Sequence, residues 1–201
     1  MRRITAIAMF ATACLFGTAL MAQKKPREPQ RPEKPSVQAQ DSPQQMKQLV
    51  HRVFEDLFNN GRYGAISEVY ASNCVVHERG KTVPLEHSVS EGKNFRSAAP
   101  DLHMTPGGMS VDGNIVTVSW TGRGSHSGKA NGLMKPTGKH FQVSGSSRFR
   151  IENGKIAEVW NDWDRNELFR QIGVSPGAAY LYDKAEDVML ALERIFPRGP
   201  S

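Results

Sequence analysis

The fold is decided by residues 139–163, KHFQVSGSSRFRIENGKIAEVWNDW, which contain two long segments joined by a tight turn. Lys139–Ile151 and Lys155–Trp163 are rich in strand-forming residues and alternate apolar with polar side chains over much of their length. Asn153-Gly154 lies between them and is typical of a two-residue hairpin turn, because that turn needs positive φ angles. The stretch therefore predicts a long antiparallel hairpin.

More strands precede this hairpin. Residues 102–111 and Asn114–Ser125 are joined by Asp112-Gly113, which predicts a second hairpin, and a short strand is expected around Cys74–Glu78. Long antiparallel strands can enclose helices only if the sheet curves strongly. Glycines within strands suit such bends, and the predicted strands contain Gly122, Gly124 and Gly145.

Helical patterns lie on both sides of the strands. Ser42-Pro43-Gln44-Gln45 has the features of a helix start, and apolar residues then follow at helical spacing from Met46 to Phe58, before Asn59-Asn60-Gly61. Four more helices are expected, over about 63–71, Ser88–Ala98, about 165–172 and 178–196. The helix over 165–172 should end at Gly173.

This order of elements predicts an α+β fold, in which a cone-shaped curved antiparallel sheet wraps over N-terminal helices and an extra helix follows at the C-terminus. Such a sheet leaves a hollow of the kind that binds small molecules. The predicted organisation is a signal peptide over 1–22, a proline-rich charged linker over 23–41, the cone domain over 42–174 and a helical extension over 175–201.

The leader predicts export to the periplasm or the exterior. Arg2 and Arg3 precede the apolar run Ile4–Leu20, and Ala22 is a suitable cleavage point, so no stable membrane span is expected in the mature form. An uncleaved anchor and a lipoprotein acylated at Cys14 are the alternatives. Prolines then recur every three residues from 26 to 35, which favours a polyproline II spacer over a ligand for a proline-binding module.

The net charge of +6 suggests a nucleic-acid-binding protein only until the charges are located. Residues 42–201 carry 19 basic and 17 acidic side chains, and the remaining excess lies in the leader and the linker. The domain is therefore close to neutral, and no nucleic-acid partner is expected. Cleavage of the leader would leave Cys74 as the lone cysteine, which excludes an intramolecular disulfide.

Short motifs follow one another in a fixed order through residues 46–173: Val76-His77, Ala99-Pro100-Asp101-Leu102, Gly124-Ser125-His126-Ser127-Gly128, Pro136-Thr137-Gly138-Lys139, Phe149-Arg150, Gly154-Lys155-Ile156, Glu158-Val159-Trp160, Asp164 and Leu168-x-x-Gln171-Ile172-Gly173. This series resembles the SnoaL-like polyketide cyclase (ester cyclase) family. The resemblance implies the nuclear-transport-factor-2-like cone and a homodimer. That superfamily includes acid/base enzymes such as ketosteroid isomerases, and also proteins with no known reaction.

The first catalytic candidate is His126. Even-numbered residues from Val116 onward share the apolar face of their strand, so His126 projects from the core-facing side at the mouth of the hollow. It could donate a hydrogen bond to a carbonyl group or carry a proton. A hydrogen-bonded rim histidine at a turn is the structural alternative.

The other catalytic candidates are Asp164 and Asp162, which share parity with Trp160 in the last strand. A carboxylate beside an indole in a hollow has a raised pKa and suits acid/base work. The resemblance implies that the family's acid/base aspartate lies at or near Asp164. Asp164 is equally suited to be the N-cap of the next helix, with Glu167 at the third position, and capping would lower its pKa.

Substrate-binding candidates complete the predicted wall. The resemblance implies that His77 faces the pocket, although strand alternation places it opposite Val76. The aromatic candidates are Trp120, Phe141, Phe149 and Trp160. The sequence has no HxH, HExxH or CxxC spacing and no phosphate-binding glycine loop, so neither a metal nor a cofactor is expected.

The leading hypothesis is a cyclase or isomerase that needs no cofactor and acts on a small hydrophobic or aromatic carbonyl compound. Asp164 or Asp162 would remove a proton next to the carbonyl group, and His126 would stabilise the enolate oxygen. The main alternative is a non-catalytic binding or dimerisation module. Epoxide hydrolysis is disfavoured, because Arg123 and Arg148 are expected to point outward, and export argues against a polyketide substrate made in the cytoplasm.

Overall fold

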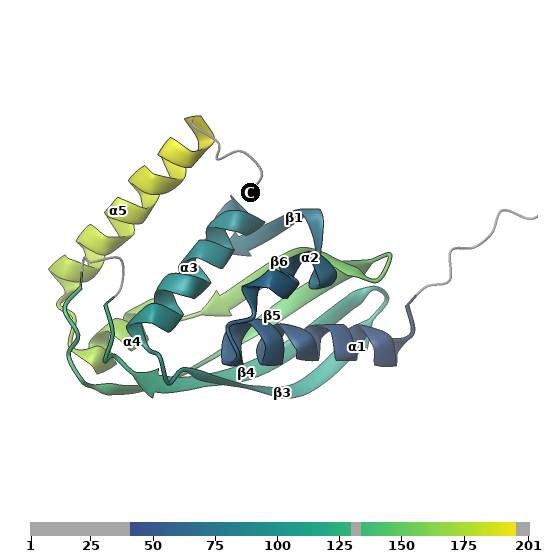
Figure 1. Cartoon of the computed structure of the whole chain (residues 1–201), viewed down its shortest axis with the longest axis horizontal. Helices are drawn as coiled ribbons and strands as arrows, with labels where there is room; N and C mark the ends of the chain where they lie inside the picture. Colours follow the sequence, from purple (N-terminus) through teal and green to yellow (C-terminus); the bar gives the residue numbers. More distant parts are fainter. Residues whose placement is uncertain (1–40, 130–133, 196–201) are drawn as a thin grey trace, which may run out of the picture. The chain divides into compact units, whose positions relative to one another are not determined.

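The computed structural model describes residues 41–129 and 134–195. The predicted signal peptide, the linker apart from Asp41, and Cys14 lie outside the described residues. One curved sheet packs against helices on its concave side (Figure 1), which confirms the predicted α+β class. The strands are β1 (Tyr70–Glu78), β2 (Lys81–Pro84), β3 (His103–Asp112), β4 (Ile115–Ser125), β5 (His140–Glu152) and β6 (Lys155–Trp163).

The helices differ in length and type. The described ones are α1 (Pro43–Arg52), the π-helical η1 (Val53–Asn59), the 3-10 turn η2 (Tyr63–Ala65), α2 (Ile66–Val69), α3 (Leu85–Ala98), α4 (Arg165–Ile172) and α5 (Pro176–Ile195). The prediction of one helix over 63–71 is wrong at its end, because the chain enters β1 at Tyr70. The helix predicted from Ser88 begins one turn earlier, at Leu85.

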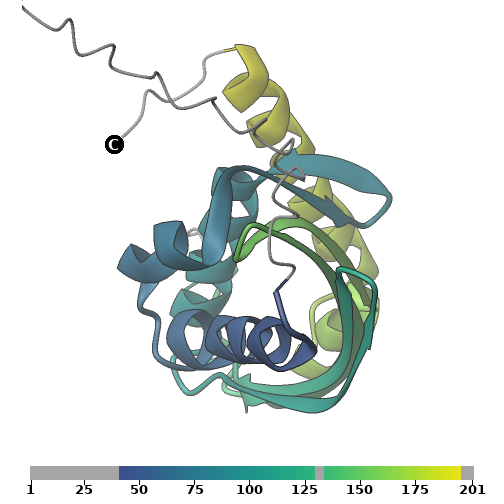
Figure 2. The ribbon, with the colours of Figure 1, turned by 90° about the vertical axis from the view of Figure 1, so that its right-hand side faces the viewer.

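The first helix is fixed by its cap and by its apolar stripe. Ser42 Oγ accepts the Gln45 backbone N–H at 3.3 Å, and Gln45 Oε1 accepts the Ser42 N–H at 2.8 Å, which is the predicted capping box. The stripe continues into η1 and is buried in the core. Its most buried members are Val50, Val53 and Phe54. Figure 2 shows this helix lying within the curl of the sheet.

The strand order is β2-β1-β6-β5-β4-β3. Both predicted hairpins are present, but the sheet is not wholly antiparallel, because β1 pairs with β6 in parallel. The short β2 was not predicted; Arg79 and Gly80 form its turn, both with positive φ. From these pairings, β1, β4 and β6 run in one direction, so their C-terminal ends lie at the same end of the sheet.

A bulge in β6 changes the direction of its side chains. Arg150 pairs with Glu158 but Ile151 pairs with Ile156, so one residue of β6 is extra at this point. Ile156 faces the core before the bulge, and Val159 does so after it. The prediction that Trp160 and Asp162 face inward is therefore wrong, since it assumed uninterrupted alternation.

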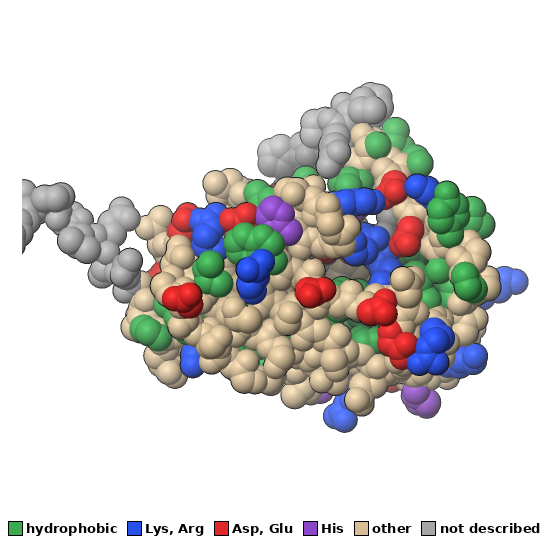
Figure 3. Space-filling model, turned by 180° about the vertical axis from the view of Figure 1, so that it is seen from behind, with side chains coloured by type: hydrophobic (Ala, Val, Ile, Leu, Met, Phe, Trp, Pro, Cys, Tyr) green, Lys and Arg blue, Asp and Glu red, His purple; other side chains and the backbone are tan. Residues whose placement is uncertain are grey.

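Helix α5 packs against the rest of the domain along one side. Tyr182 is buried, and its ring meets that of Phe169 edge-on at 5.9 Å. Lys81 also pairs with Asp187 on this helix. The opposite side is apolar and exposed (Figure 3), with Tyr180, Leu181, Val188 and Leu192. Among the described residues, no helix is both long and apolar enough to cross a membrane.

Candidate functional site

A cavity of about 210 Å³ lies between the concave face of the sheet and the helices. Its wall is mainly apolar, and three of the predicted aromatic residues, Trp120, Phe141 and Phe149, line it. Phe95 of α3 contributes another ring, which packs at 5.7 Å from that of Phe141. An apolar, partly enclosed space of this kind suits a small organic molecule.

A chain of hydrogen bonds crosses the cavity wall from strand to strand. Trp120 Nε1 donates to Ser147 Oγ at 3.0 Å, and Ser147 Oγ donates to Asn161 Oδ1 at 2.8 Å. All three residues line the cavity. Because Ser147 fixes the Asn161 oxygen, the Asn161 amide N–H groups remain as further donors in this row. Sequence reasoning missed both residues. Asn161 faces inward only because of the bulge in β6, whereas Ser147 shares the inward parity of Phe149 on β5 and could have been found by strand alternation.

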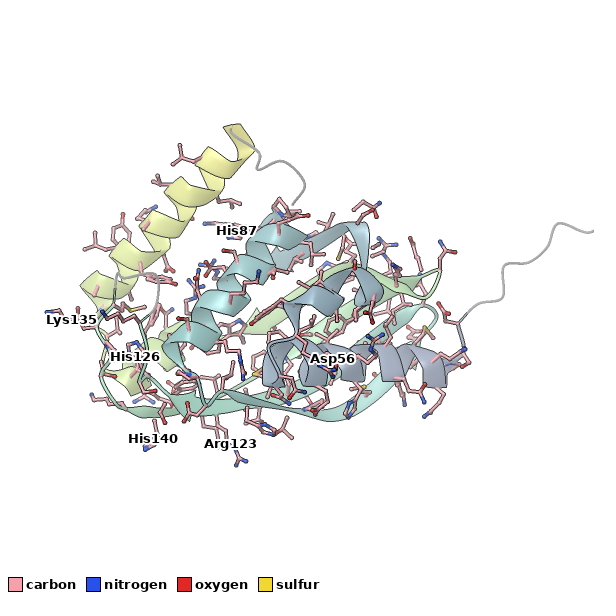
Figure 4. The ribbon with its side chains drawn as sticks, in the orientation of Figure 1. Asp56, His87, Arg123, His126, Lys135 and His140 are labelled. Carbon is pink, nitrogen blue, oxygen red and sulfur yellow. The ribbon has the colours of Figure 1, made fainter. Side chains whose placement is uncertain are left out.

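His126 follows the end of β4 and is only 3% exposed. Its backbone is held on both sides, because its N–H donates to the Lys139 carbonyl group and its carbonyl oxygen accepts the Gly138 N–H, each at 2.9 Å. Gly128 packs against the end of α3. Its N–H donates to the Ala98 carbonyl oxygen, and a Cβ atom at position 128 would overlap the Ser97 carbonyl oxygen. Figure 4 shows His126 on the inner side of the sheet, whereas Arg123 and His140 point away from the helices.

The two nitrogens of the His126 imidazole differ in their contacts. Nδ1 lies 3.2 Å from Thr137 Oγ1, while the buried Nε2 has no hydrogen-bond partner among residues 41–129 and 134–195, and the residue lines the cavity. Burial lowers the pKa of His126 below its usual value, so the ring is neutral at pH 7. When the Thr137 hydroxyl group donates to Nδ1, the ring proton lies on Nε2 and can be donated into the cavity.

Neither predicted aspartate lines the cavity. Asp164 is exposed and is the N-cap of α4, where its Oδ1 accepts the Asn166 N–H at 2.8 Å. Asp162 is also exposed and lies beside a groove on the other face of the sheet. The prediction that Asp164 or Asp162 lies in the same cavity as His126 is therefore wrong.

His77 and Trp160 also lie on that other face. Their rings stack with centroids 5.3 Å apart, and Arg148 lies over the indole at 5.0 Å. His77 Nε2 is 2.7 Å from Glu158 Oε1, and this contact, together with that of Arg150, lowers the pKa of Glu158. Strand alternation predicted this direction for His77, but the pocket role implied by the resemblance does not fit it.

Glu78 is a cavity residue that the sequence analysis did not single out. It ends β1, on the same face as the buried Cys74 and Val76, and it lines the cavity. Its Oε1 atom is buried and has no hydrogen-bond partner in the part of the chain that the structure describes. The strand alternation that excluded His77 could have identified it.

Charged residues near α5 border the same cavity. Arg165 pairs with Asp183 of α5 at 3.0 Å and with Glu91 of α3 at 3.6 Å. Its guanidinium group also lies over the ring of Tyr182, which lines the cavity. Within the described ranges, no group of three His, Cys, Asp or Glu side chains is arranged to hold a metal ion.

Comparison with known proteins gave consistent results. The family model for SnoaL-like polyketide cyclases matches residues 48–172. Similar solved structures include AclR of Streptomyces galilaeus, a candidate hydroxylase, with a TM-score of 0.61 and 21% identity over 67% of this chain and 100% of that one. A candidate SnoaL-like polyketide cyclase from Jannaschia sp. CCS1 has a TM-score of 0.60 and 20% identity over 68% and 98% of the two chains.

A third similar structure is IdmH of Streptomyces antibioticus, a candidate polyketide cyclase, with a TM-score of 0.57 and 24% identity over 65% and 99% of the chains. A search of curated proteins gave no match. The similar structures are covered almost completely, whereas α5 lies beyond the part of this chain that the family model matches.

Proposed function

Because the chain belongs to the SnoaL-like polyketide cyclase family, we propose that it binds a small apolar carbonyl compound in its cavity and acts on it by acid/base chemistry without a cofactor. One observation carries this proposal: the buried His126 lines a mainly apolar cavity, and its Nε2 atom has no hydrogen-bond partner among the described residues. A buried polar atom without a partner is costly, and a ligand oxygen would relieve that cost.

The chemistry follows from the neutral imidazole. An N–H group at Nε2 would donate to the carbonyl oxygen and would stabilise the negative charge that develops there when a neighbouring C–H bond is broken and its proton passes to a solvent water molecule. The donor is already fixed by its contact with Thr137 and by the backbone on both sides, so little reorganisation is needed. Polyketides are rich in carbonyl groups, which agrees with the names of the family and of similar structures.

A non-catalytic binding protein is the second candidate, and the placement of the aspartates favours it. Asp164 caps α4 and Asp162 lies on the opposite face of the sheet. Neither is positioned to remove a proton from a molecule in the cavity. Binding and turnover therefore need separate measurements.

Binding is tested with two probes, 2-tetralone, a small bicyclic ketone, and tetralin, which has the same rings without the carbonyl group. In calorimetric titrations the wild type should prefer 2-tetralone by about fivefold or more, the effect of one hydrogen bond. His126→Leu should abolish that preference, and His126→Gln, which keeps an N–H donor, should retain part of it. An unchanged preference in His126→Leu would contradict the proposal.

Turnover is tested by proton exchange. Wild-type protein should speed the exchange of the protons next to the 2-tetralone carbonyl group in D₂O, followed by NMR, and His126→Leu should slow it. Binding that depends on His126, without faster exchange than in buffer, would identify the protein as the non-catalytic binder.

A further inference from the structure

One side of helix α5 is apolar and faces solvent. Among the described side chains, the large apolar ones that are exposed all belong to this helix, and each is at least half exposed: Tyr180, Leu181, Val188 and Leu192. Ala179 and Leu190 lie on the opposite side of the helix and are buried. A group of large apolar side chains on one exposed surface is typical of an interaction site, whereas single exposed ones are ordinary. Helix α5 therefore has a surface that suits a partner.

The order of side chains along this surface is symmetric. Leu181, Ala185, Val188 and Leu192, here called the α5 stripe, follow one another at intervals of four, three and four residues, which keeps them on one side of the helix. In a two-fold symmetric contact, residue i of one copy meets residue j of the other, and j meets i. Two antiparallel α5 helices would therefore place Leu181 against Leu192 and Ala185 against Val188. The small Ala185 side chain leaves room for Val188 and lets the helices approach closely.

The charged side chains beside the α5 stripe fit the same antiparallel arrangement. Lys184 and Asp187 are partly exposed and lie along one edge of the stripe, with Lys184 Nζ 3.8 Å from Asp187 Oδ2. Antiparallel pairing brings Asp187 of a second copy within about one helical turn of Lys184, and the reverse contact follows by symmetry. Parallel pairing would instead place each of these charges level with its own like charge, which is unfavourable. Charge complementarity therefore favours the antiparallel direction.

The exposed apolar area is of the size that a weak dimer needs. Specific interfaces bury at least about 1,000 Å² in total, which is about 500 Å² from each copy. The three large side chains of the α5 stripe and the neighbouring Tyr180, all half or more exposed, supply an area of this order. A lipid surface is a poorer fit, since Pro176–Ile195 contains four acidic and two basic residues, and helices that lie on membranes usually have an excess of basic ones.

We propose that two copies of this chain pair through α5, with the two helices antiparallel and the α5 stripe of each copy packed against that of the other. The pairing does not depend on the proposed function, because the four stripe residues lie outside the cavity wall. The family match does not imply it either, since α5 follows the matched residues 48–172. The C-terminal helix is then an interface that this chain adds to the cone domain.

Sedimentation equilibrium of the purified full chain measures the pairing. The wild type should form dimers at micromolar concentration, and Val188→Lys should raise the dimer Kd at least about tenfold, because it places a charge in the contact. Ser144→Lys is the matched control: it adds the same charge at an exposed position on the outer face of the sheet and should leave the dimer Kd unchanged. Both variants should keep the circular dichroism spectrum of the wild type, since both side chains are exposed. A single-chain mass of the wild type at all concentrations, or an unchanged dimer Kd in Val188→Lys, would overturn the proposal.

Disulfide formation tests the antiparallel direction. Leu181→Cys and Leu192→Cys are made separately in a Cys14→Ser background, then mixed and oxidised; Cys74 can stay, because burial raises its pKa to about 11 and keeps the thiol protonated. The mixture should give a covalent dimer with one copy of each variant. Either variant alone should give none, because antiparallel pairing sets the two copies of one position about 16 Å apart along the helix, too far for a disulfide. No covalent dimer in the mixture, or a covalent dimer of either variant with itself, would overturn the antiparallel pairing.

Discussion

The sequence suggests two roles for Asp164, a helix N-cap and an acid/base residue, and its contacts in the structure fit only the first. The motif Asp164-Arg165-Asn166-Glu167 suits an N-cap, and the carboxylate accepts the Asn166 N–H. The same position suits the family's acid/base residue by resemblance. The side chain is exposed and lies outside the cavity wall, so its observed contacts are those of a cap.

Two substitutions of Asp164 test this role. Asp164→Ala should lower the free energy of unfolding by about 1 kcal/mol, whereas Asp164→Asn should change it little, because asparagine caps helices as well as aspartate does. Both variants should bind 2-tetralone like the wild type. Loss of proton exchange in Asp164→Asn, with stability unchanged, would return Asp164 to the acid/base role.

His126 makes the folded state sensitive to acid. Burial lowers the pKa of this group in the folded protein, so the unfolded chain takes up the proton first as the pH falls. The contribution of His126 to stability is therefore complete above the unfolded value of 6.5 and is lost as the pH falls from there toward the folded pKa. The free energy of unfolding of the wild type and of His126→Gln is measured by chemical denaturation between about pH 5 and pH 8. Only the wild type should show the additional loss of stability below about pH 6.5. Parallel pH profiles would contradict it.

At the scale of elements, the sequence predicted what depends on local patterns. The capping box at Ser42 and Gln45, both hairpins and the inward face of β4 follow from residues close together in the chain. The bulge in β6 does not, because it appears only when β5 and β6 are placed in register. Three predicted site residues, Trp160, Asp162 and Asp164, lie after that bulge.

Long-range pairings were also missing from the sequence analysis. The parallel pairing of β1 with β6 joins segments about eighty residues apart, and it brings Glu78 beside Asn161. Strand β2 has only four residues, ends in proline and shows little alternation of apolar and polar side chains, so its sequence indicates a strand only weakly. Asn161 could be placed in the cavity wall only once the register of β5 and β6 was known, whereas strand alternation alone could place Glu78 there.

Helix α5 lies beyond residues 48–172, the region that the family model matches. It supplies Tyr182 to the cavity wall, and its Asp183 pairs with Arg165 at the start of α4. We expect the helix to be a structural part of the pocket. Its attachment depends mainly on its buried apolar side chains, Ala179, Tyr182 and Leu190, because the ion pairs are partly exposed and contribute little.

Tyrosines 180 and 182 give a matched test of that attachment. Tyr182→Ala should lower the free energy of unfolding by about 2–4 kcal/mol, since it removes a buried ring that packs on Phe169. Tyr180→Ala, at a side chain that is 61% exposed, should change it by no more than about 0.5 kcal/mol. Equal effects of the two substitutions in denaturant titrations would show that α5 is not anchored through Tyr182.

At the scale of the whole molecule, the family resemblance implies a homodimer, and that remains a prediction. Light scattering of the purified protein should give the mass of two chains at micromolar concentration. A single-chain mass across the accessible concentrations would contradict it. Export of the chain likewise remains a prediction, and N-terminal sequencing of the mature protein would locate the cleavage point that Ala22 suggests.

The proposed function depends most on the contact between a ligand carbonyl group and His126. It is measured directly by the ¹³C resonance of 2-tetralone labelled at its carbonyl carbon and bound to the protein. Donation from Nε2 should shift this resonance downfield in the wild type relative to His126→Leu, in which the donor is absent. The same bound shift in both proteins would mean that the carbonyl group does not contact His126, and the proposed function would fall.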